Sequence, residues 1–287
     1  MPNLRQVVQQ THRTLEAAGI PDARLEAEVA VMNVVRMARQ DLFARQEAEV
    51  SPQQERDLAQ LLERRLKREP LAYILGRKEF YGINLLVNSN VLIPRPETES
   101  LLEHALFMAL MGMETPALVI ADVGTGTGAI AINLALHLPR ARIFAIDSSD
   151  AALDVASYNI RGHNVADRVT LLQGDLLEPL PEPVDLIVAN LPYLPTDRIP
   201  TLQPEIQWEP RLALDGGADG LDAIRRLLAQ AAKGKLKEVG VVLLELDPEQ
   251  VPAVQALAQQ LFPEAQTSVE QDLARRDRIF VINRGLG

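Results

Sequence analysis

The chain contains no cysteine, and its four histidines stand singly at positions 12, 104, 137 and 163. Disulfides, thiolate zinc sites and cysteine nucleophiles are therefore excluded, and we expect no metal site. No apolar run approaches the roughly 18 residues that a membrane span needs. The N-terminal segment mixes polar and apolar residues at helical spacing, unlike a signal peptide. These absences predict a cytoplasmic protein with no membrane partner.

Charge is unevenly distributed along the 287 residues, which are enough for one large and one small domain. Apolar residues make up 47% and charged residues 24%, as in ordinary soluble globular proteins. Residues 1–78 carry 13 Lys/Arg against 11 Asp/Glu, whereas residues 79–287 carry 16 against 28. Such an acidic segment is poorly suited to gripping a polyanion, because Lys and Arg supply most non-specific nucleic-acid affinity. We therefore expect a protein or small-molecule partner and no direct nucleic-acid binding.

Three apolar patterns of helical period begin near Leu4, Asp22 and Ser51. The last opens with Ser51 and Gln54 spaced as a capping box, with Pro52 at the first helical position. We predict a small helical domain over residues 1–78. Residues 79–93 are rich in β-formers broken by turn residues, which predicts a hairpin linker.

From residue 94 to 287, short apolar runs alternate with longer helical patterns. The runs cover residues 117–121, 143–146, 169–172, 184–189 and 239–246. Apolar strands separated by helices predict an α/β domain whose parallel sheet is covered on both faces. Residues 278–284 follow a loop instead of a helix, so we expect them to form an antiparallel last strand.

The sharpest local signal lies where the first apolar run meets Gly124, Thr125, Gly126, Thr127 and Gly128 before an apolar helix. Glycine lets a backbone turn tightly and approach a ligand closely, and free N–H groups at a helix start favour an anionic group such as a carboxylate. The spacing is G-x-G-x-G, which differs from the dinucleotide pattern G-x-G-x-x-G. The segment is a candidate ligand loop, and a plain tight turn is the alternative.

Asp147 ends the second apolar run, twenty-three residues after Gly124. Doubly wound nucleoside-binding folds place an acid at about this point to bind ribose hydroxyls. The alternative is a cap for the helix that begins near Ala151, although Ser149 or Asp150 suits that role as well. Its place at the carboxyl end of a strand favours the ribose role.

The fourth apolar run ends in Asn190, Leu191, Pro192 and Tyr193. Ligands of open α/β sheets bind at the carboxyl edge, where this polar and aromatic segment stands. A turn with a packed tyrosine is an equally good interpretation of the tetrapeptide alone. Combined with the glycine loop and Asp147, the functional interpretation is favoured.

These three features resemble the class I methyltransferases that modify planar nitrogen, whose usual tetrapeptide is Asn-Pro-Pro-Tyr. Three further segments, PLAYILGRKEFYG (70–82), VLIPRPETE (91–99) and EPRLALDGGADGLD (209–222), narrow the resemblance to the HemK/PrmC-type family. These are peptide chain release factor N5-glutamine methyltransferases, and the likeness covers nearly the whole chain. The segment Pro-Arg-Pro-Glu-Thr-Glu at 94–99 favours this branch over ribosomal-protein glutamine methyltransferases. The resemblance implies a seven-stranded Rossmann-like class I methyltransferase sheet behind a helical substrate-recognition domain.

The resemblance further implies methyl transfer from S-adenosylmethionine to the glutamine side-chain amide in the GGQ motif of class I peptide chain release factors. Asn190 and the Leu191 carbonyl would accept the two N–H bonds of the target amide, and Pro192 and Tyr193 would complete the catalytic segment. The cofactor would lie against residues 124–128, Asp147, Asp175, Leu176 and Asn190. Glu97 and Thr98 would shape the methyl-donor side of the pocket. Glu97 equally suits the first turn of a helix, where the dipole favours an acid.

Three positions depart from the family pattern: Leu191 stands for a proline, Leu176 for a tryptophan near the adenine, and Asp247 for a glycine. Two rival functions remain open at this point. An adenine-N6 nucleic-acid methyltransferase would present the same two N–H donors to the tetrapeptide, but the acidic domain counts against it. A non-catalytic S-adenosylmethionine-binding adaptor is suggested by the Leu191 departure.

Overall fold

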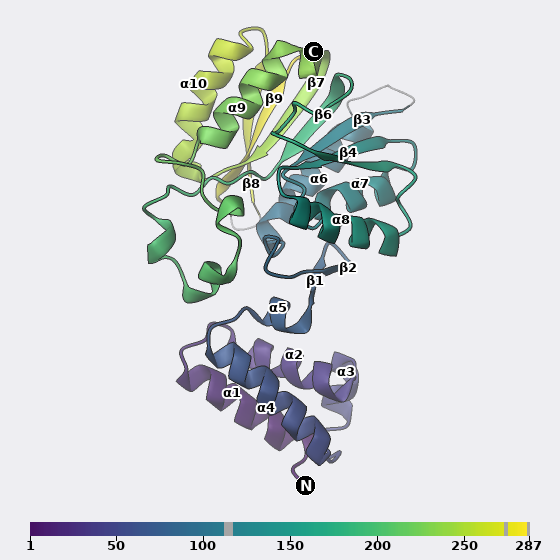
Figure 1. The fold of residues 1–287 in the computed structure, drawn as a ribbon, viewed down its shortest axis with the longest axis vertical. Helices are drawn as coiled ribbons and strands as arrows, with labels where there is room; N and C mark the ends of the chain where they lie inside the picture. Colours follow the sequence, from purple (N-terminus) through teal and green to yellow (C-terminus); the bar gives the residue numbers. More distant parts are fainter. Residues whose placement is uncertain (112–116, 273–274, 286–287) are drawn as a thin grey trace. The chain divides into compact units, whose positions relative to one another are not determined.

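The computed structural model describes residues 1–111, 117–272 and 275–285, and the chain divides into two compact units (Figure 1). Unit 1 contains Met1–Gly76 and Pro204–Trp208. Unit 2 contains Arg77–Gln203 and Glu209–Gly287. The first unit thus ends two residues earlier than the helical domain predicted from the sequence.

Unit 1 is helical, as its apolar spacing predicts. Its elements are α1 (Leu4–Ala17), α2 (Ala23–Val35), α3 (Arg39–Ala44), α4 (Pro52–Leu66), α5 (Leu71–Leu75) and the 3₁₀ segment η2 (Pro204–Trp208). The capping box is confirmed, because Ser51 and Gln54 each accept a hydrogen bond from the other's backbone N–H. The sequence patterns did not identify α3 and α5, which are too short to show a helical period.

A buried arginine organises part of unit 1. Arg65 is 2% exposed and donates hydrogen bonds to Glu26 at 2.6 Å and to Glu205 at 2.9 Å. Arg68 approaches the same Glu205 carboxylate at 3.1 Å. A buried charge is costly without a paired partner. These pairs therefore attach the η2 segment to α4.

Unit 2 begins with a hairpin of β1 (Arg77–Phe80) and β2 (Ile83–Leu86). The hairpin starts earlier than the predicted 79–93 and ends at Leu86. The strand pattern fails after Leu86 because Asn88 forms a turn, accepting a hydrogen bond from the N–H of Asn90. Phe80 and Leu85 are buried in the core of unit 2, so the hairpin packs as part of that unit.

The main sheet has seven strands in the order β5-β4-β3-β6-β7-β9-β8. They are β3 (Val119–Val123), β4 (Arg142–Asp147), β5 (Val169–Gln173), β6 (Val184–Ala189), β7 (Leu236–Glu245), β8 (Gln266–Gln271) and β9 (Asp277–Asn283). The last strand, β9, is antiparallel to both of its neighbours, as predicted. The pattern search missed β8, a half-exposed edge strand rich in polar residues.

Alternate residues of the central strands point to opposite faces of the sheet and pack into two separate hydrophobic cores. Ile120 and Leu186 point to the face covered by α6 (Pro96–Met111), α7 (Ala129–His137) and α8 (Asp150–Gly162). Ala121 and Ile187 point to the face covered by α9 (Asp222–Gln230) and α10 (Val251–Leu261) (Figure 1). Short helical segments η1 (Ile199–Thr201), η3 (Arg211–Ala213), η4 (Ala231–Lys235) and η5 (Pro248–Gln250) lie in the connections. Covering both faces leaves the carboxyl edge of the parallel strands as the place for a site.

Candidate active site

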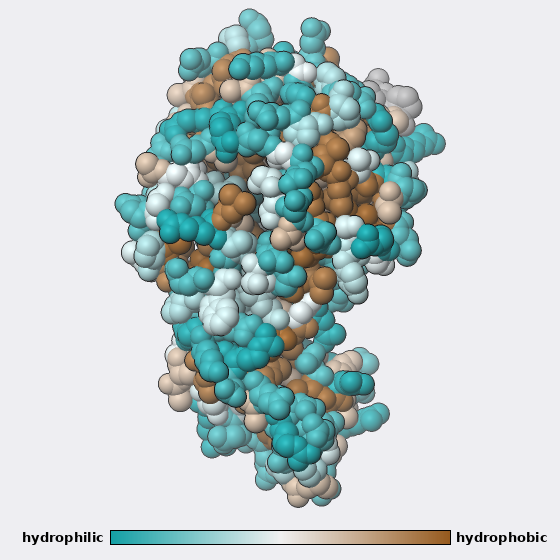
Figure 2. Space-filling model, in the orientation of Figure 1, coloured by the Kyte–Doolittle hydropathy of each residue, from teal (hydrophilic) through white to brown (hydrophobic). Residues whose placement is uncertain are grey.

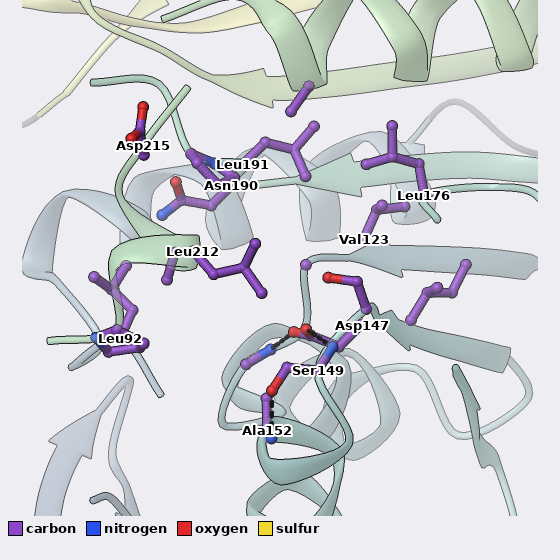
Figure 3. Close-up of a pocket in the computed structure, with 18 of the residues that line it drawn as sticks. Leu92, Val123, Asp147, Ser149, Ala152, Leu176, Asn190, Leu191, Leu212 and Asp215 are labelled. Carbon is purple, nitrogen blue, oxygen red and sulfur yellow. Dashed lines mark hydrogen bonds between the residues drawn. The ribbon is translucent and has the colours of Figure 1, made fainter. Parts of the chain in front are cut away.

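A cavity of about 510 Å³ opens at the carboxyl ends of the central strands. Strand β3 is flanked by β4 on one side and β6 on the other, so the direction of strand addition reverses here. Such a switch point is the usual ligand site of open α/β sheets. Figure 3 shows that Asp147 and Asn190 stand on different walls of this one cavity.

The glycine loop forms the floor of the cavity, with Gly124 and Gly126 among its lining residues. Gly124 has a φ of +74°, and a Cβ there would lie 3.3 Å from the Cδ2 atom of Leu191. The positive φ therefore favours glycine at this position, and a Cβ there would also press on the Leu191 side chain. Thr125, Thr127 and Gly128 do not line the cavity.

The backbone N–H groups of this loop are largely engaged inside the protein. Those of Gly124 and Thr125 donate to the carbonyl of Ile146, and that of Gly128 donates to the carbonyl of Thr125. The N–H of Gly126 donates to Asp147 at 2.9 Å. The expected anion site on free loop N–H groups is therefore not supported for these residues.

A second carboxylate, Asp122, lies beneath the loop and was missed by the sequence interpretation. Its Oδ2 atom accepts hydrogen bonds from the Thr125 hydroxyl at 2.6 Å and the Ala131 N–H at 3.1 Å. Burial raises the pKa of Asp122 to about 7, and the nearby charge of Asp147 adds to the rise. Asp122 thus joins the end of β3, the loop and the first turn of α7.

Asp147 stands at the end of β4 and lines the cavity. Its two carboxylate oxygens accept hydrogen bonds from the N–H groups of Gly126 and Ser149, each at 2.9 Å. The cap of α8 is Ser149, whose hydroxyl oxygen accepts from the N–H of Ala152. The alternative of a helix cap at Asp147 is therefore not realised.

Asp175 and Leu176, after β5, form another wall. Asp175 pairs with Arg226 at 2.5 Å, and Arg226 also lines the cavity. Leu176 is buried and has a φ of +54°, unusual for a side chain with a Cβ. Leu176 contributes an apolar side chain to this wall of the cavity.

Asn190 connects the cavity to a buried chain of hydrogen bonds. Its Nδ2 atom donates to the Thr98 hydroxyl oxygen at 2.9 Å. The Thr98 hydroxyl donates to the Oε2 atom of Glu245 at 2.8 Å. Burial raises the pKa of Glu245 to about 7, although hydrogen bonds from the Thr98 and Tyr193 hydroxyls and the charge of Arg278 favour its ionised form. Thr98 was expected at the methyl-donor side of the pocket, and the structure places it behind Asn190.

Leu191 and Pro192 line the cavity beside Asn190, whereas Tyr193 does not. Burial and the nearby Glu245 carboxylate raise the pKa of Tyr193 to about 12, so its hydroxyl stays protonated. The Tyr193 hydroxyl in turn favours the ionised form of Glu245. A packing role for Tyr193 against a target amide stays a prediction.

The segment after Tyr193 is clamped to residues 214–217. The N–H of Leu194 donates to Leu214 at 3.1 Å, and the N–H of Gly216 donates back to Leu194 at 2.9 Å. A Cβ on Gly216 would lie 2.6 Å from the carbonyl oxygen of Pro192, and one on Gly220 would lie 2.1 Å from that of Tyr193. The hydrogen bonds join residues 192–194 to the loop of residues 214–220, and the two glycines allow the backbones to approach this closely.

Glu97 lies in the first turn of α6, as its alternative interpretation proposed, and pairs with Arg276 at 3.0 Å. It does not line the cavity. Arg95 pairs with Glu209, which also accepts the N–H of Ile93 at 3.1 Å. Asp247, one of the three departures, caps the 3₁₀ segment η5 and pairs with Arg198.

The sequence interpretation gave no role to several other lining residues. They include Asn90, Val91, Leu92, Thr196, Pro210, Leu212, Asp215 and Arg226. Leu212 is 62% exposed although it faces the cavity in Figure 3. Leu92 and residues 210–215 belong to two of the segments on which the family resemblance rests. That resemblance was the signal in the sequence that could have assigned them to the site.

Comparison with known proteins agrees with both units. Residues 6–76 match the family model of the PrmC N-terminal domain, and residues 104–201 match the methyltransferase small domain. A release factor glutamine methyltransferase of Moorella thermoacetica is 45% identical over 282 residues, covering 98% of each chain. One from Deinococcus radiodurans is 38% identical, covering 99% of each. A solved methyltransferase from Pyrococcus furiosus has a TM-score of 0.52 at 15% identity, covering 80% of this chain and 98% of that one.

The strand order and the cavity at its switch point define a class I methyltransferase fold. The relatives that are 38–45% identical over nearly the full length of the chain then identify the family. The chain belongs to the release factor glutamine methyltransferases.

Among residues 1–111, 117–272 and 275–285, no group of His, Asp and Glu side chains is arranged to hold a metal ion. Within the same part of the chain, no helix combines the length and apolar character of a membrane span.

Proposed function

We propose that this chain transfers a methyl group from S-adenosylmethionine to the side-chain amide nitrogen of the glutamine in the GGQ motif of class I peptide chain release factors. One observation carries the proposal. A single cavity is lined by the glycine loop and Asp147 on one wall and by Asn190, Leu191 and Pro192 on another. A donor and an acceptor of a methyl group can therefore meet in it. Because the proposed substrate is a translation factor, we place the protein in the cytoplasm.

The residues present fit the cofactor. A volume of about 510 Å³ suits a ligand of its size, since small-molecule pockets span roughly 300–1,000 Å³. Each oxygen of Asp147 accepts one N–H bond and keeps a further lone pair, so the carboxylate can also accept ribose hydroxyls. Leu176 and Ile146 offer apolar surface for an adenine ring. Leu176 fills this role without the stacking that a tryptophan would give.

The chemistry asks for positioning, because the lone pair of an amide nitrogen is delocalised into its carbonyl. The bound cofactor supplies an electrophilic methyl group. Asn190 Oδ1 and the Leu191 carbonyl accept the two N–H bonds of the target amide and hold its nitrogen in place. As positive charge grows on that nitrogen, both acceptors bind it more strongly than in the ground state, which lowers the barrier. After the methyl group has transferred, the nitrogen loses one of its two protons to water and becomes neutral.

Incubation with labelled S-adenosylmethionine tests the function. We expect label on a class I release factor and, by mass spectrometry, one added methyl group on its GGQ glutamine. Total cellular RNA and unmethylated DNA serve as competing acceptors. Label on adenine would support the nucleic-acid methyltransferase, and binding of the cofactor without transfer would support the adaptor.

We further propose that unit 1 supplies recognition of the release factor away from the reacting glutamine. A chain that begins at Arg77 keeps the hairpin whose Phe80 and Leu85 are buried in unit 2. It should keep cofactor affinity but lose at least about tenfold, or 1.4 kcal/mol, in kcat/KM on an intact release factor. A short peptide that carries the GGQ motif is the control substrate, on which both forms should be equally active. Full activity of the shortened chain on the intact factor would show that unit 1 serves another purpose.

A further inference from the structure

Two buried side chains behind Asn190 are not used by the proposed reaction directly. Thr98 lies in the first turn of α6, and Glu245 is the last residue of β7. Thr98 is 6% exposed and Glu245 is 2% exposed, and neither lines the cavity. They stand 92 and 55 positions from Asn190 in the sequence, so only the fold brings the three together.

The chemistry of the three groups fixes the direction of each hydrogen bond. An ionised carboxylate can only accept, so the single hydroxyl proton of Thr98 is given to Glu245. The Thr98 oxygen can then only accept from its other neighbour. Asn190 must therefore turn its NH₂ group toward Thr98, as observed at 2.9 Å. The Oδ1 atom is left on the other edge of the carboxamide.

We propose that Thr98 and Glu245 are positioning residues that hold the Asn190 carboxamide with Oδ1 available as the acceptor for the target amide. The inference rests on the proposed function, because that reaction requires an acceptor at this point. With the carboxamide turned over, Asn190 would present N–H donors to the N–H donors of the substrate. Such an arrangement repels the developing positive charge that catalysis needs to stabilise.

The surroundings of Glu245 support an ionised state that can change near neutral pH. From β9, Arg278 favours the charged form, and from α6, Glu97 opposes it. From the segment after β6, the Tyr193 hydroxyl favours the charged form. Because burial raises the pKa of Glu245 to about 7, the carboxyl group gains a proton in mildly acidic solution. It can then donate to Thr98, whose own proton is freed to bond the Asn190 oxygen.

Three variants test the inference in the full chain. Thr98→Val keeps the shape and removes the hydroxyl. We expect kcat to fall by about tenfold to a hundredfold, less than the roughly hundredfold to thousandfold loss on removing a preorganised transition-state contact, because Asn190 itself remains. Cofactor affinity and KM should change far less. Thr98→Ser restores the hydroxyl and should recover most of the lost kcat. Ser100→Ala, at another buried hydroxyl of α6, is the matched control and should stay near wild type.

The pH dependence of kcat distinguishes positioning from a merely structural role, because a structural role would leave it unchanged. The wild-type kcat should rise between pH 6 and 8 with a midpoint near 7, and Glu245→Gln should flatten this rise. Wild-type activity in Thr98→Val, or the same pH rise in Glu245→Gln, would overturn the inference.

A spectroscopic measurement separates this inference from the proposed function. The side-chain amide resonances of Asn190 in ¹⁵N-labelled protein are assigned by their loss in Asn190→Asp. They should shift with pH in the wild type and stay fixed in Glu245→Gln. If the wild type transfers no methyl group but its resonances shift in this way, the proposed function fails, and only the orientation of the Asn190 carboxamide by Thr98 and Glu245 is retained. If methyl transfer occurs while the resonances ignore both Thr98→Val and pH, the positioning inference fails alone.

Discussion

Two walls of the cavity, the glycine loop and the segment that contains Asn190, each rest on a buried carboxylate that accepts a threonine hydroxyl. Under the glycine loop, Asp122 accepts from Thr125, three residues away. Behind the catalytic segment, Glu245 accepts from Thr98, 147 residues away. Burial raises the pKa of both acids to about 7.

The two pairs act on different parts of the site. Asp122 accepts hydrogen bonds from Thr125 in the glycine loop and from the Ala131 N–H in the first turn of α7. Because all three residues belong to one strand-turn-helix unit, Asp122 fixes the local backbone conformation. Glu245 is linked through Thr98 to the side chain of Asn190, so it bears on the orientation of a carboxamide that lines the cavity. Similar burial and similar partners therefore fix backbone at one wall and, by our inference, orient a side chain at the other. Variants at the two walls should therefore separate into stability effects and rate effects.

The largest expected effect is on stability, at Asp122. Unfolded aspartate has a pKa of about 3.9, whereas the folded value is about 7. Between these pH values the folded chain holds a proton that the unfolded chain has lost, so the free energy of unfolding falls as pH rises and levels off above about 7. Asp122→Asn does not titrate and should escape this loss, which is at most about 4 kcal/mol at about 1.4 kcal/mol per pKa unit. Urea unfolding at pH 5 and pH 8 measures it, and equal pH slopes in both proteins would contradict it.

Asn190→Ala should show the largest effect on rate. It removes an acceptor aimed at developing positive charge, and a loss of about a hundredfold or more in kcat/KM, roughly 2.7 kcal/mol, is expected. Steady-state kinetics with a release factor measures the loss. Calorimetry of cofactor binding is the control, and a variant that keeps wild-type kcat/KM would remove Asn190 from the reaction.

Asp147→Ala should weaken cofactor binding by about 1–3 kcal/mol, the range for losing hydrogen bonds to a charged group. Because the same carboxylate accepts from Gly126 and Ser149, part of the loss would come from a looser glycine loop. Calorimetric titration with S-adenosylmethionine measures the effect. Asp150→Ala, an exposed acid in the first turn of α8, is the matched control. Unchanged affinity with an intact fold would take Asp147 out of the cofactor site.

The smallest expected effect is at Leu191, where the family pattern has proline. The proposed acceptor is the backbone carbonyl, which leucine supplies as well as proline does. Pro192 already favours an extended conformation at Leu191, so fixing its φ adds little. Leu191→Pro should change kcat/KM by less than about tenfold, or roughly 1.4 kcal/mol. Methyl transfer by Leu191→Pro alone, with none by the native chain, would favour the adaptor.

The fold was predictable where an element carries a continuous apolar run, a periodic apolar pattern or a clear helix cap. Strand β6 is buried throughout and α4 carries a capping box, and both stand where the sequence places them. Strand β8 was missed because an edge strand has a solvated face and no apolar run. The turn at Asn88 ended the hairpin early, because a local side-chain bond outweighed the β-forming composition that follows.

The parts of the site that could be predicted are those whose residues lie close together in the sequence. The glycine loop and Asp147 belong to consecutive strand ends, so motif spacing brought them together. Asp122 and Glu245 gave no sequence signal, because an acid at the end of an apolar strand looks alike whether it faces solvent or a buried hydroxyl. Glu97 and Thr98 are neighbours in one motif, yet one pairs with an arginine at the surface and the other bonds Asn190.

The loop of residues 215–220 gives the family signature a steric meaning. At Gly216 and Gly220, any side chain would occupy the space already filled by the carbonyl oxygens of Pro192 and Tyr193. A methyl group added at either place would push on the catalytic segment while touching no ligand. Two glycines of the signature EPRLALDGGADGLD are thus explained by the absence of a side chain. They leave room for the backbone of residues 192 and 193 and need not contact a ligand themselves.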